Sequence, residues 1–368
     1  MDVNDKSITL LISSLRPGGA EGVCVTVANG LARLGWDITL VVLNLTNSTR
    51  QSQIDKSINI YSLNCEHARD SFFKLLKYLK VNNPKKILVF NHQLAIILVF
   101  LRMITRSKYI IIARNINTLS LEKKNTKSFW HKYIITIFIR CFYHKVDHII
   151  AQSAGMKKDL INYLGFADEK ISVIYNPVNE SFSDFSRKMD WSNSNRDEYV
   201  LCVGRLEQQK AFHYAIDIFS RIILKHEKIH MIIIGEGSQK NNLIDYAHRL
   251  GIESKIDFLG FRDDLEEYYS KAKVVLLTSL FEGFPNVLVE ALTVGTPVVS
   301  FNCQNGPSEI IKSGNGFLVS FKDIFDGVEK LNLALLKEWD YKKIATDAEK
   351  YHAAVVVNYY SDILARNY

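Results

Sequence analysis

Two glutamates separated by seven residues lie in a segment that is suited to binding a small polar molecule. Glu282 and Glu290 follow an apolar run at 274–277 that is typical of a buried parallel strand. Gly283 marks a loop after this strand, and a helix is predicted to begin near Asn286. Glu282 could orient a sugar hydroxyl, and Glu290, inside the helix, could accept hydrogen bonds from two adjacent ribose hydroxyls. Such spacing is common by chance, so the neighbouring motifs decide its meaning.

Two cations follow another predicted strand, at 199–203. Gly204 and Arg205 come directly after it, and Lys210 stands at the end of the same loop. A guanidinium grips phosphate through paired hydrogen bonds, and a lysine adds a compact charge, so the two could hold a diphosphate. No Asp-x-Asp occurs in the chain, so the carboxylate pair that usually carries a metal-bound sugar diphosphate is missing. We therefore expect the cations to replace a metal ion, although alone they are equally consistent with surface charge.

Glycines and an aromatic residue mark the ends of further predicted strands. Gly18 and Gly19 follow a strand at 8–13, and Gly235 ends another. Glycines let the backbone approach a ligand closely, although a tight turn is the simpler interpretation of Gly18 and Gly19. The G-x-G-x-x-G fingerprint is absent, so classical dinucleotide binding is not supported. Phe261 could line a base pocket, although an aromatic residue at this position is as often part of the core.

The elements that must position these residues alternate between strand and helix twice along the chain. Its 368 residues suggest two domains, which we place at 1–180 and 198–345, and the polar run at 181–197 is typical of a linker. The alternation predicts two Rossmann-like, doubly wound α/β domains that face each other across a cleft. Ligands of such sheets lie outside the carboxyl ends of the strands, where the loops with the acids and cations are expected.

Composition narrows the class of protein. An apolar content of 47% and a charged content of 23% are those of a soluble globular protein. The five cysteines are scattered and never form C-x-x-C, which argues against a disulfide framework or a zinc site and favours a reducing cytoplasm. Asp2 and Asp5 stand where a signal peptide needs positive charge. The longest apolar run, at 94–104, is too short to span a membrane and is interrupted by Arg102.

Positive charge is concentrated in one block of the first domain. Residues 66–145 contain 16 Lys and Arg but only 3 Asp and Glu, which suits an anionic membrane surface, a lipid phosphate or nucleic acid. Within the block, aromatic residues and isoleucines at 129–145 recur at helical spacing between basic residues. This pattern predicts an interfacial helix or, equally, a helix packed on the sheet with its cations reaching solvent. Nucleic acid is the weakest alternative because no recognition motif accompanies the charge.

Taken together, the motifs resemble the retaining GT-B glycosyltransferases of family 4 over essentially the whole chain. Each motif is weak alone, but the ordered set is highly specific. The matching segments are Gly18-Gly19-Ala20-Glu21, Gly204-Arg205-Leu206 with Gln209-Lys210, Gly235-Glu236-Gly237, Phe258-Leu259-Gly260, Glu282-Gly283-Phe284-Pro285-Asn286 with Glu290, Gly295-Thr296-Pro297-Val298-Val299 and Gly306-Pro307-Ser308-Glu309.

The resemblance implies a nucleotide-sugar donor in the second domain and an acceptor on the first. It implies that Arg205 and Lys210 hold the diphosphate, Glu290 the ribose and Glu282 the donor sugar. We expect the catalytic residues to be Glu282, Arg205, Lys210 and Asn115. The expected donor-binding residues are Gly18, Gly19, Gly204, Arg205, Lys210, Gly235, Phe261, Glu282, Gly283, Phe284, Asn286, Val287 and Glu290. Helices at 346–368 would cross back to the first domain.

The sequence departs from the family pattern at two positions. Members usually carry a histidine after the fifth strand that contacts the donor sugar, where this chain has Asn115. An asparagine can still hydrogen-bond a hydroxyl, and His92, after the fourth strand, is an alternative for the role, although an ordinary loop histidine is the simpler interpretation. Ala211 follows Lys210 where glycine is common, and we expect this change to cost little.

These observations predict transfer of a hexose or N-acetylhexosamine from a UDP-sugar to a lipid-linked saccharide, with no cofactor and no metal. The setting would be synthesis of a capsule, an O-antigen or a similar surface polysaccharide, on the inner face of the cytoplasmic membrane. A UDP-sugar 2-epimerase of the same fold is an alternative, although such enzymes use acids and histidines in a first domain that is poor in acids here. A non-catalytic protein that binds nucleotide sugar is another alternative.

Overall fold

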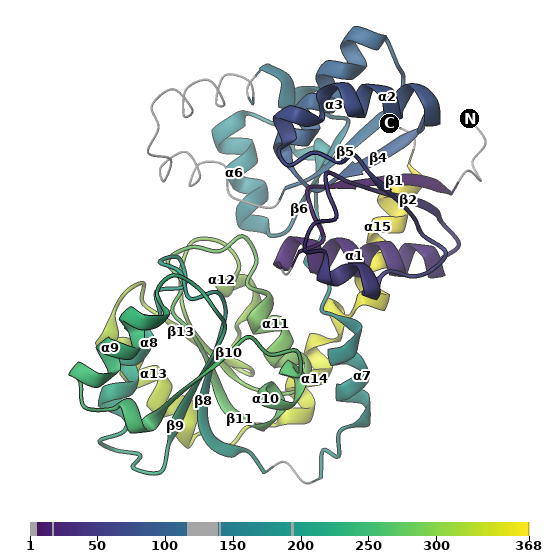
Figure 1. Ribbon diagram of the computed structural model, residues 1–368. Coiled ribbons are helices and arrows are strands. Elements are labelled where there is room, and N and C mark those ends of the chain that lie inside the picture. Colours follow the sequence, from purple (N-terminus) through teal and green to yellow (C-terminus); the bar gives the residue numbers. More distant parts are fainter. Residues whose placement is uncertain (1–5, 17, 116–138, 140, 193–194, 367) are drawn as a thin grey trace. The chain divides into compact units, whose positions relative to one another are not determined.

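The computed structural model describes residues 6–16, 18–115, 139, 141–192, 195–366 and 368. The chain forms two compact units (Figure 1). One contains Met1–Pro177 together with Ala353–Tyr368, and the other contains Val178–His352. The residues at 116–138 and at 140 lie outside the described part, so most of the helix predicted at 129–145 does too.

The first unit is built on a seven-stranded parallel sheet, ordered β3-β2-β1-β4-β5-β6-β7. Its strands are β1 (Ser7–Ile12), β2 (Asp37–Val42), β3 (Asn59–Ser62), β4 (Lys86–Val89), β5 (Ile110–Arg114), β6 (His148–Ala151) and β7 (Ile171–Val173). Helices α1 (Gly19–Arg33) and α15 (Ala353–Ala365) bury their apolar residues against one face. Helices α2 (Phe72–Asn82), α3 (His92–Thr105) and α6 (Ala154–Leu164) cover the other.

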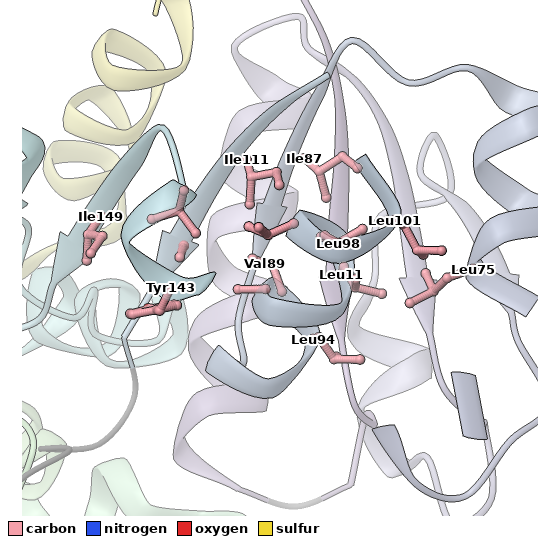
Figure 2. Packing of buried hydrophobic residues seen from close by; sticks show 14 of the residues in the cluster. Leu11, Leu75, Ile87, Val89, Leu94, Leu98, Leu101, Ile111, Tyr143 and Ile149 are labelled. Atoms are coloured by element: carbon pink, nitrogen blue, oxygen red, sulfur yellow. The ribbon is translucent and has the colours of Figure 1, made fainter. Parts of the chain in front are cut away.

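Alternation along each strand explains how one sheet supports two cores. Leu10 packs in the cluster under α1 and α15, whereas its neighbour Leu11 packs in the cluster under α2 and α3. Figure 2 shows part of the second cluster, with Val89 of β4 and Ile111 of β5 beside Leu98 of α3. Strands that are buried on both faces read as continuous apolar runs, which is why the sequence identifies them.

Helix α15 returns to the first unit and is anchored by polar contacts as well as by packing. Lys86 donates from Nζ to the carbonyl oxygen of Leu364 over 2.6 Å, at the helix end where a cation is favoured. Trp36 Nε1 donates to Ser361 Oγ at 3.0 Å, and Arg114 Nε donates to the Tyr360 hydroxyl at 2.9 Å. The crossing expected for residues 346–368 begins at residue 353 in the structure.

The second unit contains a six-stranded parallel sheet, ordered β10-β9-β8-β11-β12-β13. The strands are β8 (Asp197–Val203), β9 (His230–Ile234), β10 (Ile256–Gly260), β11 (Ala272–Leu277), β12 (Val298–Phe301) and β13 (Gly316–Val319). The helices are α7 (Glu180–Lys188), α8 (Phe212–Ile222), α9 (Lys240–Arg249), α10 (Leu265–Lys271), α11 (Asn286–Thr293), α12 (Pro307–Ile310), α13 (Ile324–Leu336) and α14 (Tyr341–Ala348). The prediction of two doubly wound α/β domains is confirmed.

The first part of the linker predicted at 181–197 is helical, because it forms most of α7. The Asn179 side chain caps this helix by accepting from the backbone N–H of Ser181 at 3.2 Å. The helix buries Phe182, Ser183 and Ser186. Because two of these three buried residues are serines, the composition is polar and the apolar stripe that identifies an amphipathic helix is hidden.

In the part of the chain that the structure describes, no helix combines the length and apolar character needed to cross a bilayer.

Candidate functional site

The site in the second unit lies where the sheet changes direction. From β8 the chain adds β9 and β10 on one side, and then returns to add β11, β12 and β13 on the other. In doubly wound sheets, ligands bind outside the carboxyl ends of the strands at such a point, which here lies between β8 and β11. The loops at 204–211 and 278–285 follow those ends, and they carry the cations and the first glutamate predicted from the sequence.

Lys210 and Glu282 form a buried ion pair between these two loops. The Lys210 Nζ lies 2.6 Å from Glu282 Oε1, and the side chains are 13% and 8% exposed. Such a pair holds both groups in place. Removing one partner would leave the other charge buried with little solvation. The backbone supports the geometry, since the Thr278 hydroxyl donates to the carbonyl oxygen of Lys210 at 3.2 Å. The sequence placed both residues in the site, and the structure shows that they contact each other.

The thiol of Cys303 lies in the electrostatic environment of this ion pair. Burial raises its pKa to about 12, and the Glu282 carboxylate adds to that rise while the Lys210 ammonium opposes it. The thiol is therefore neutral near pH 7 and contributes no charge of its own.

Gln209 connects the two loops, a role that the sequence analysis did not assign. Its Nε2 donates to the carbonyl oxygen of Phe281 at 2.9 Å, and its backbone oxygen accepts from the N–H of Leu280 at 2.8 Å. Its Oε1 accepts from Arg205 Nη2 at 3.3 Å. The Arg205 side chain is otherwise exposed, so its guanidinium is accessible to an anion at the edge of the sheet.

Close backbone contact explains two of the predicted glycines. Gly204 and Gly235 have φ values of 151° and 144°, a region that side chains disfavour. A Cβ on Gly235 would collide with the carbonyl oxygen of Gly204, and one on Gly204 would lie 3.1 Å from Lys210 Cε. These glycines let the loops after β8 and β9 pack together. Glu207 strengthens that junction, because its Oε1 accepts from the N–H of Ser238 at 2.9 Å.

Some of the residues that follow Glu282 are buried, and others are partly exposed. Phe284 and Val287 are buried, and the Phe284 ring lies 6.0 Å from the ring of Tyr351. Asn286 begins α11 and is half-buried, like Gly283 and Glu290. Backbone N–H groups at the start of a helix attract anions, so the beginning of α11 at Asn286 is suited to a phosphate group.

Glu290 and Phe261 were also expected at the site. Tyr269 of α10, which the sequence analysis did not single out, donates from its hydroxyl to Glu290 Oε2 at 3.0 Å. Phe261 follows β10 and is 60% exposed, so it is not a core residue. The N–H of Gly235 donates to the carbonyl oxygen of Gly260 at 2.8 Å, which places Phe261 beside the loop that follows β9.

The first unit also contains residues to which the sequence analysis assigned a role in binding the donor: Asn115, Gly18, Gly19 and, as an alternative to Asn115, His92. Asn115 is buried, and its Oδ1 accepts from the Tyr143 hydroxyl at 3.2 Å. Gly18 precedes α1 with an extended φ of −175°, which any residue can adopt, and Gly19 is the first residue of that helix. His92 is the first residue of α3 and is half-buried. No contact of these residues tests the sugar-binding roles predicted for them.

Among the described residues, no three His, Cys, Asp or Glu side chains gather where they could share a metal ion.

Ala211, which we expect to cost little in place of glycine, has a φ of +47°. An L-residue in this left-handed region carries a strain of roughly 1–2 kcal/mol, which a glycine avoids. Glycine also makes the unfolded chain more flexible, so we expect Ala211→Gly to stabilise the protein by only about 0.5–1 kcal/mol net. Thermal unfolding checks this, with Ala215→Gly in the interior of α8 as a control that should destabilise by about 1 kcal/mol. A lower melting temperature for Ala211→Gly would contradict the expectation.

Comparisons with known proteins match each half of the chain to a protein family. The model of the family described as Glycosyltransferase Family 4 matches residues 17–182, and the model described as Glycosyl transferases group 1 matches residues 185–351. An N-acetylgalactosamine-N,N'-diacetylbacillosaminyl-diphospho-undecaprenol 4-alpha-N-acetylgalactosaminyltransferase of Campylobacter jejuni is 27% identical over 94% of this chain and 99% of its own. An amylovoran biosynthesis glycosyltransferase of Erwinia amylovora is 24% identical over 98% and 99% of the two chains.

Solved structures resemble the whole chain. The Anabaena protein HepE, determined in complex with UDP-glucose, superposes with a TM-score of 0.78 at 20% identity, over 98% of this chain and 99% of its own. A lipopolysaccharide outer core galactosyltransferase, WaaB, superposes with a TM-score of 0.73 at 22% identity, over 97% and 99% of the two chains. At these identities the likeness shows the fold alone.

Proposed function

Because the chain belongs to the GT-B glycosyltransferases, with a family 4 domain followed by a group 1 domain, we propose that it transfers a hexose or N-acetylhexosamine from a UDP-sugar to a lipid-linked saccharide. We further propose that the reaction retains the anomeric configuration and serves synthesis of a surface polysaccharide such as a capsule or an O-antigen. The resemblance to this class, inferred from the motifs, is confirmed. The donor, the acceptor and the stereochemistry belong to the proposal.

The observation that carries the proposal is the arrangement of charge where the sheet of the second unit changes direction. Arg205 is exposed beside the buried pair of Lys210 and Glu282, and all three stand on the loops that follow β8 and β11. A sugar-diphosphate bond breaks with the development of negative charge on the departing diphosphate. Fixed cations at that position stabilise the transition state, and they remove the need for a metal ion to neutralise the charge.

We assign the other residues of the site to contacts with the sugar, the ribose and the base of the donor. Glu282, held in place by Lys210, would accept a hydrogen bond from a hydroxyl of the donor sugar. Glu290 would accept hydrogen bonds from the ribose diol, and Phe261 would contact the base. No side chain of this site is assigned as the base that deprotonates the acceptor. In a reaction with retention, the departing phosphate can take the acceptor proton on the same face of the sugar.

The acceptor is inferred from the relatives and from the charge of the first unit. The Campylobacter jejuni relative acts, by its name, on a saccharide linked to diphospho-undecaprenol, and its chain matches this one over 94% of the length. The basic block at 66–145 would attract a diphosphate of that kind and the anionic membrane that holds it.

A direct test is release of UDP from a panel of UDP-glucose, UDP-galactose, UDP-GlcNAc and UDP-GalNAc, with membrane extract as the source of the acceptor. We expect one donor to give UDP and a lipid-linked product, and Glu290→Ala to abolish most of that activity. Formation of an epimer of the sugar, with no transfer of sugar from the UDP-sugar to lipid, would favour the 2-epimerase instead. Binding of a UDP-sugar with neither product would favour the non-catalytic alternative.

We also propose that α2 and the end of α3 contact an anionic membrane. Phe73 and Val81 of α2 are 77% and 74% exposed, and Met103 and Ile104 of α3 are 47% and 58% exposed. Lys77 and Lys80 of α2 and Arg106 after α3 are exposed close to these residues in the sequence. The two helices pack together, with the rings of Phe72 and Phe100 6.1 Å apart. Exposed apolar side chains among cations are typical of proteins that bind a lipid interface.

Sedimentation with vesicles tests this surface. We expect binding to phosphatidylglycerol vesicles that weakens as salt rises, and no binding to neutral phosphatidylcholine vesicles or to duplex DNA. Phe73→Ser should weaken binding about tenfold, because it removes an aromatic ring from the apolar contact. Phe325→Ser changes a ring of the second unit that is 75% exposed, and it should leave binding unaltered. Equal losses in the two variants would contradict the assignment.

A further inference from the structure

Tyr269 is a fully buried side chain whose hydroxyl group contacts the candidate site. It lies in α10, and its hydroxyl donates to Oε2 of Glu290 in α11 at 3.0 Å. Its ring meets the ring of Phe182 of α7 edge-on, with centroids 5.5 Å apart. Its carbonyl oxygen accepts from the Thr296 hydroxyl at 2.6 Å. The residue is therefore held by contacts from three segments, and its hydroxyl reaches a carboxylate that is half-exposed.

The direction of this hydrogen bond is fixed. Burial, together with the charge of the Glu290 carboxylate, raises the pKa of Tyr269 well above its ordinary value. The phenol therefore stays protonated through the physiological range and donates to Glu290. A hydrogen bond to a charged acceptor is stronger than one between neutral groups, so the carboxylate is held at Oε2 before any ligand arrives.

A carboxylate held in one orientation binds a diol better than a mobile one. A glutamate on a helix surface samples several rotamers, and ordering such a side chain on binding costs conformational entropy. Two adjacent hydroxyls need both oxygens of one carboxylate at a defined angle, so they gain most from a group that is already oriented. A single hydroxyl, which can follow a rotating carboxylate, gains less.

We propose that Tyr269 is a positioning residue that orients the Glu290 carboxylate toward a ribose diol, and that it thereby sets the preference of this enzyme for ribonucleotides over 2′-deoxyribonucleotides. The inference rests on the proposed function, because it takes the ligand of Glu290 to be the ribose of the donor. The bond between α10 and α11 could instead serve only to hold the two helices together. In that case its removal would change stability and leave the choice of nucleotide unaltered.

The test compares the affinities of UDP and 2′-deoxy-UDP, measured by titration calorimetry, in wild type and Tyr269→Phe. This substitution removes one oxygen and keeps the ring contacts. We expect wild type to prefer UDP by about 10-fold to 100-fold, as for a hydroxyl bonded to a charged group. In Tyr269→Phe, we expect this preference to fall at least fivefold through weaker binding of UDP. In turnover, the variant should raise the KM for the donor more than it lowers kcat.

Tyr246→Phe is the matched control. The Tyr246 hydroxyl also donates to a carboxylate of the second unit, that of Asp217, away from the loops of the candidate site. This variant should lose stability and keep the wild-type preference for UDP. An unchanged preference in Tyr269→Phe would overturn the inference while the proposed function stands. If wild type binds UDP and 2′-deoxy-UDP equally, the ribose role of Glu290 fails, and the inference fails with it. If wild type binds neither, the proposed function itself fails.

Discussion

Replacing Lys210 with alanine is expected to lower the rate of sugar transfer by about 100-fold to 1,000-fold. The ammonium group lies 2.6 Å from the Glu282 carboxylate. In the function that we propose, this group binds the departing diphosphate, on which negative charge develops. Removing one fixed donor at a developing negative charge typically produces a loss of this size. The variant should also unfold more easily, by about 3 kcal/mol, because it leaves the buried Glu282 carboxylate without its partner.

A double substitution separates the loss of transfer rate from the loss of stability. In Lys210→Met/Glu282→Leu the buried charge is gone, so most of the lost stability should return, while transfer should remain absent. The control is Lys271→Ala, which breaks an exposed lysine–glutamate pair and should change neither the rate nor the melting temperature measurably. Steady-state transfer and thermal unfolding are the two measurements. A double variant that regained activity together with stability would contradict a catalytic role for Lys210.

Replacing Arg205 with alanine should lower transfer by about 100-fold and leave stability nearly unchanged. The guanidinium is exposed, and its hydrogen bond to Gln209 is 3.3 Å long, so the folded protein loses little when it is removed. The diphosphate, in contrast, would lose a donor that can bind two oxygens at once. Arg205→Lys should recover only part of the rate, because an ammonium lacks the planar pair of donors.

The measurement is the donor KM and kcat in a transfer assay, with thermal unfolding recorded in parallel. Arg249→Ala removes another exposed arginine of the same unit, one that lies over the Tyr246 ring, and it should behave as wild type. A wild-type KM and kcat in Arg205→Ala would remove this residue from the site.

The fold could be predicted from the sequence because both sheets are parallel and buried. Their strands read as short apolar runs, and glycines or polar residues mark the ends of those runs, as at Gly204 after β8. The residues at the carboxyl ends of β8 and β11 were identified for the same reason. Helix α7 was missed because serines occupy most of its buried face.

Contacts between distant residues could not be predicted in this way. Lys210 and Glu282 are 72 positions apart, and each was assigned to a ligand before the structure showed them paired. Tyr269 lies on a different helix from Glu290, and no periodic pattern distinguishes it from any other buried tyrosine. The left-handed backbone at Ala211 was missed although glycine is common at this position in the family, because alanine itself gives no sign of a conformation that it disfavours.

We propose that Arg205 and Lys210 bind the diphosphate of a nucleotide sugar without a metal ion. Titration calorimetry of the UDP-sugar chosen by the donor panel, in buffer that contains EDTA, tests this most directly. We predict that wild type binds with the same affinity as in magnesium, and that Arg205→Ala/Lys210→Met binds at least 100-fold more weakly. Binding that disappears in EDTA, or that persists unchanged in the double variant, would contradict the account.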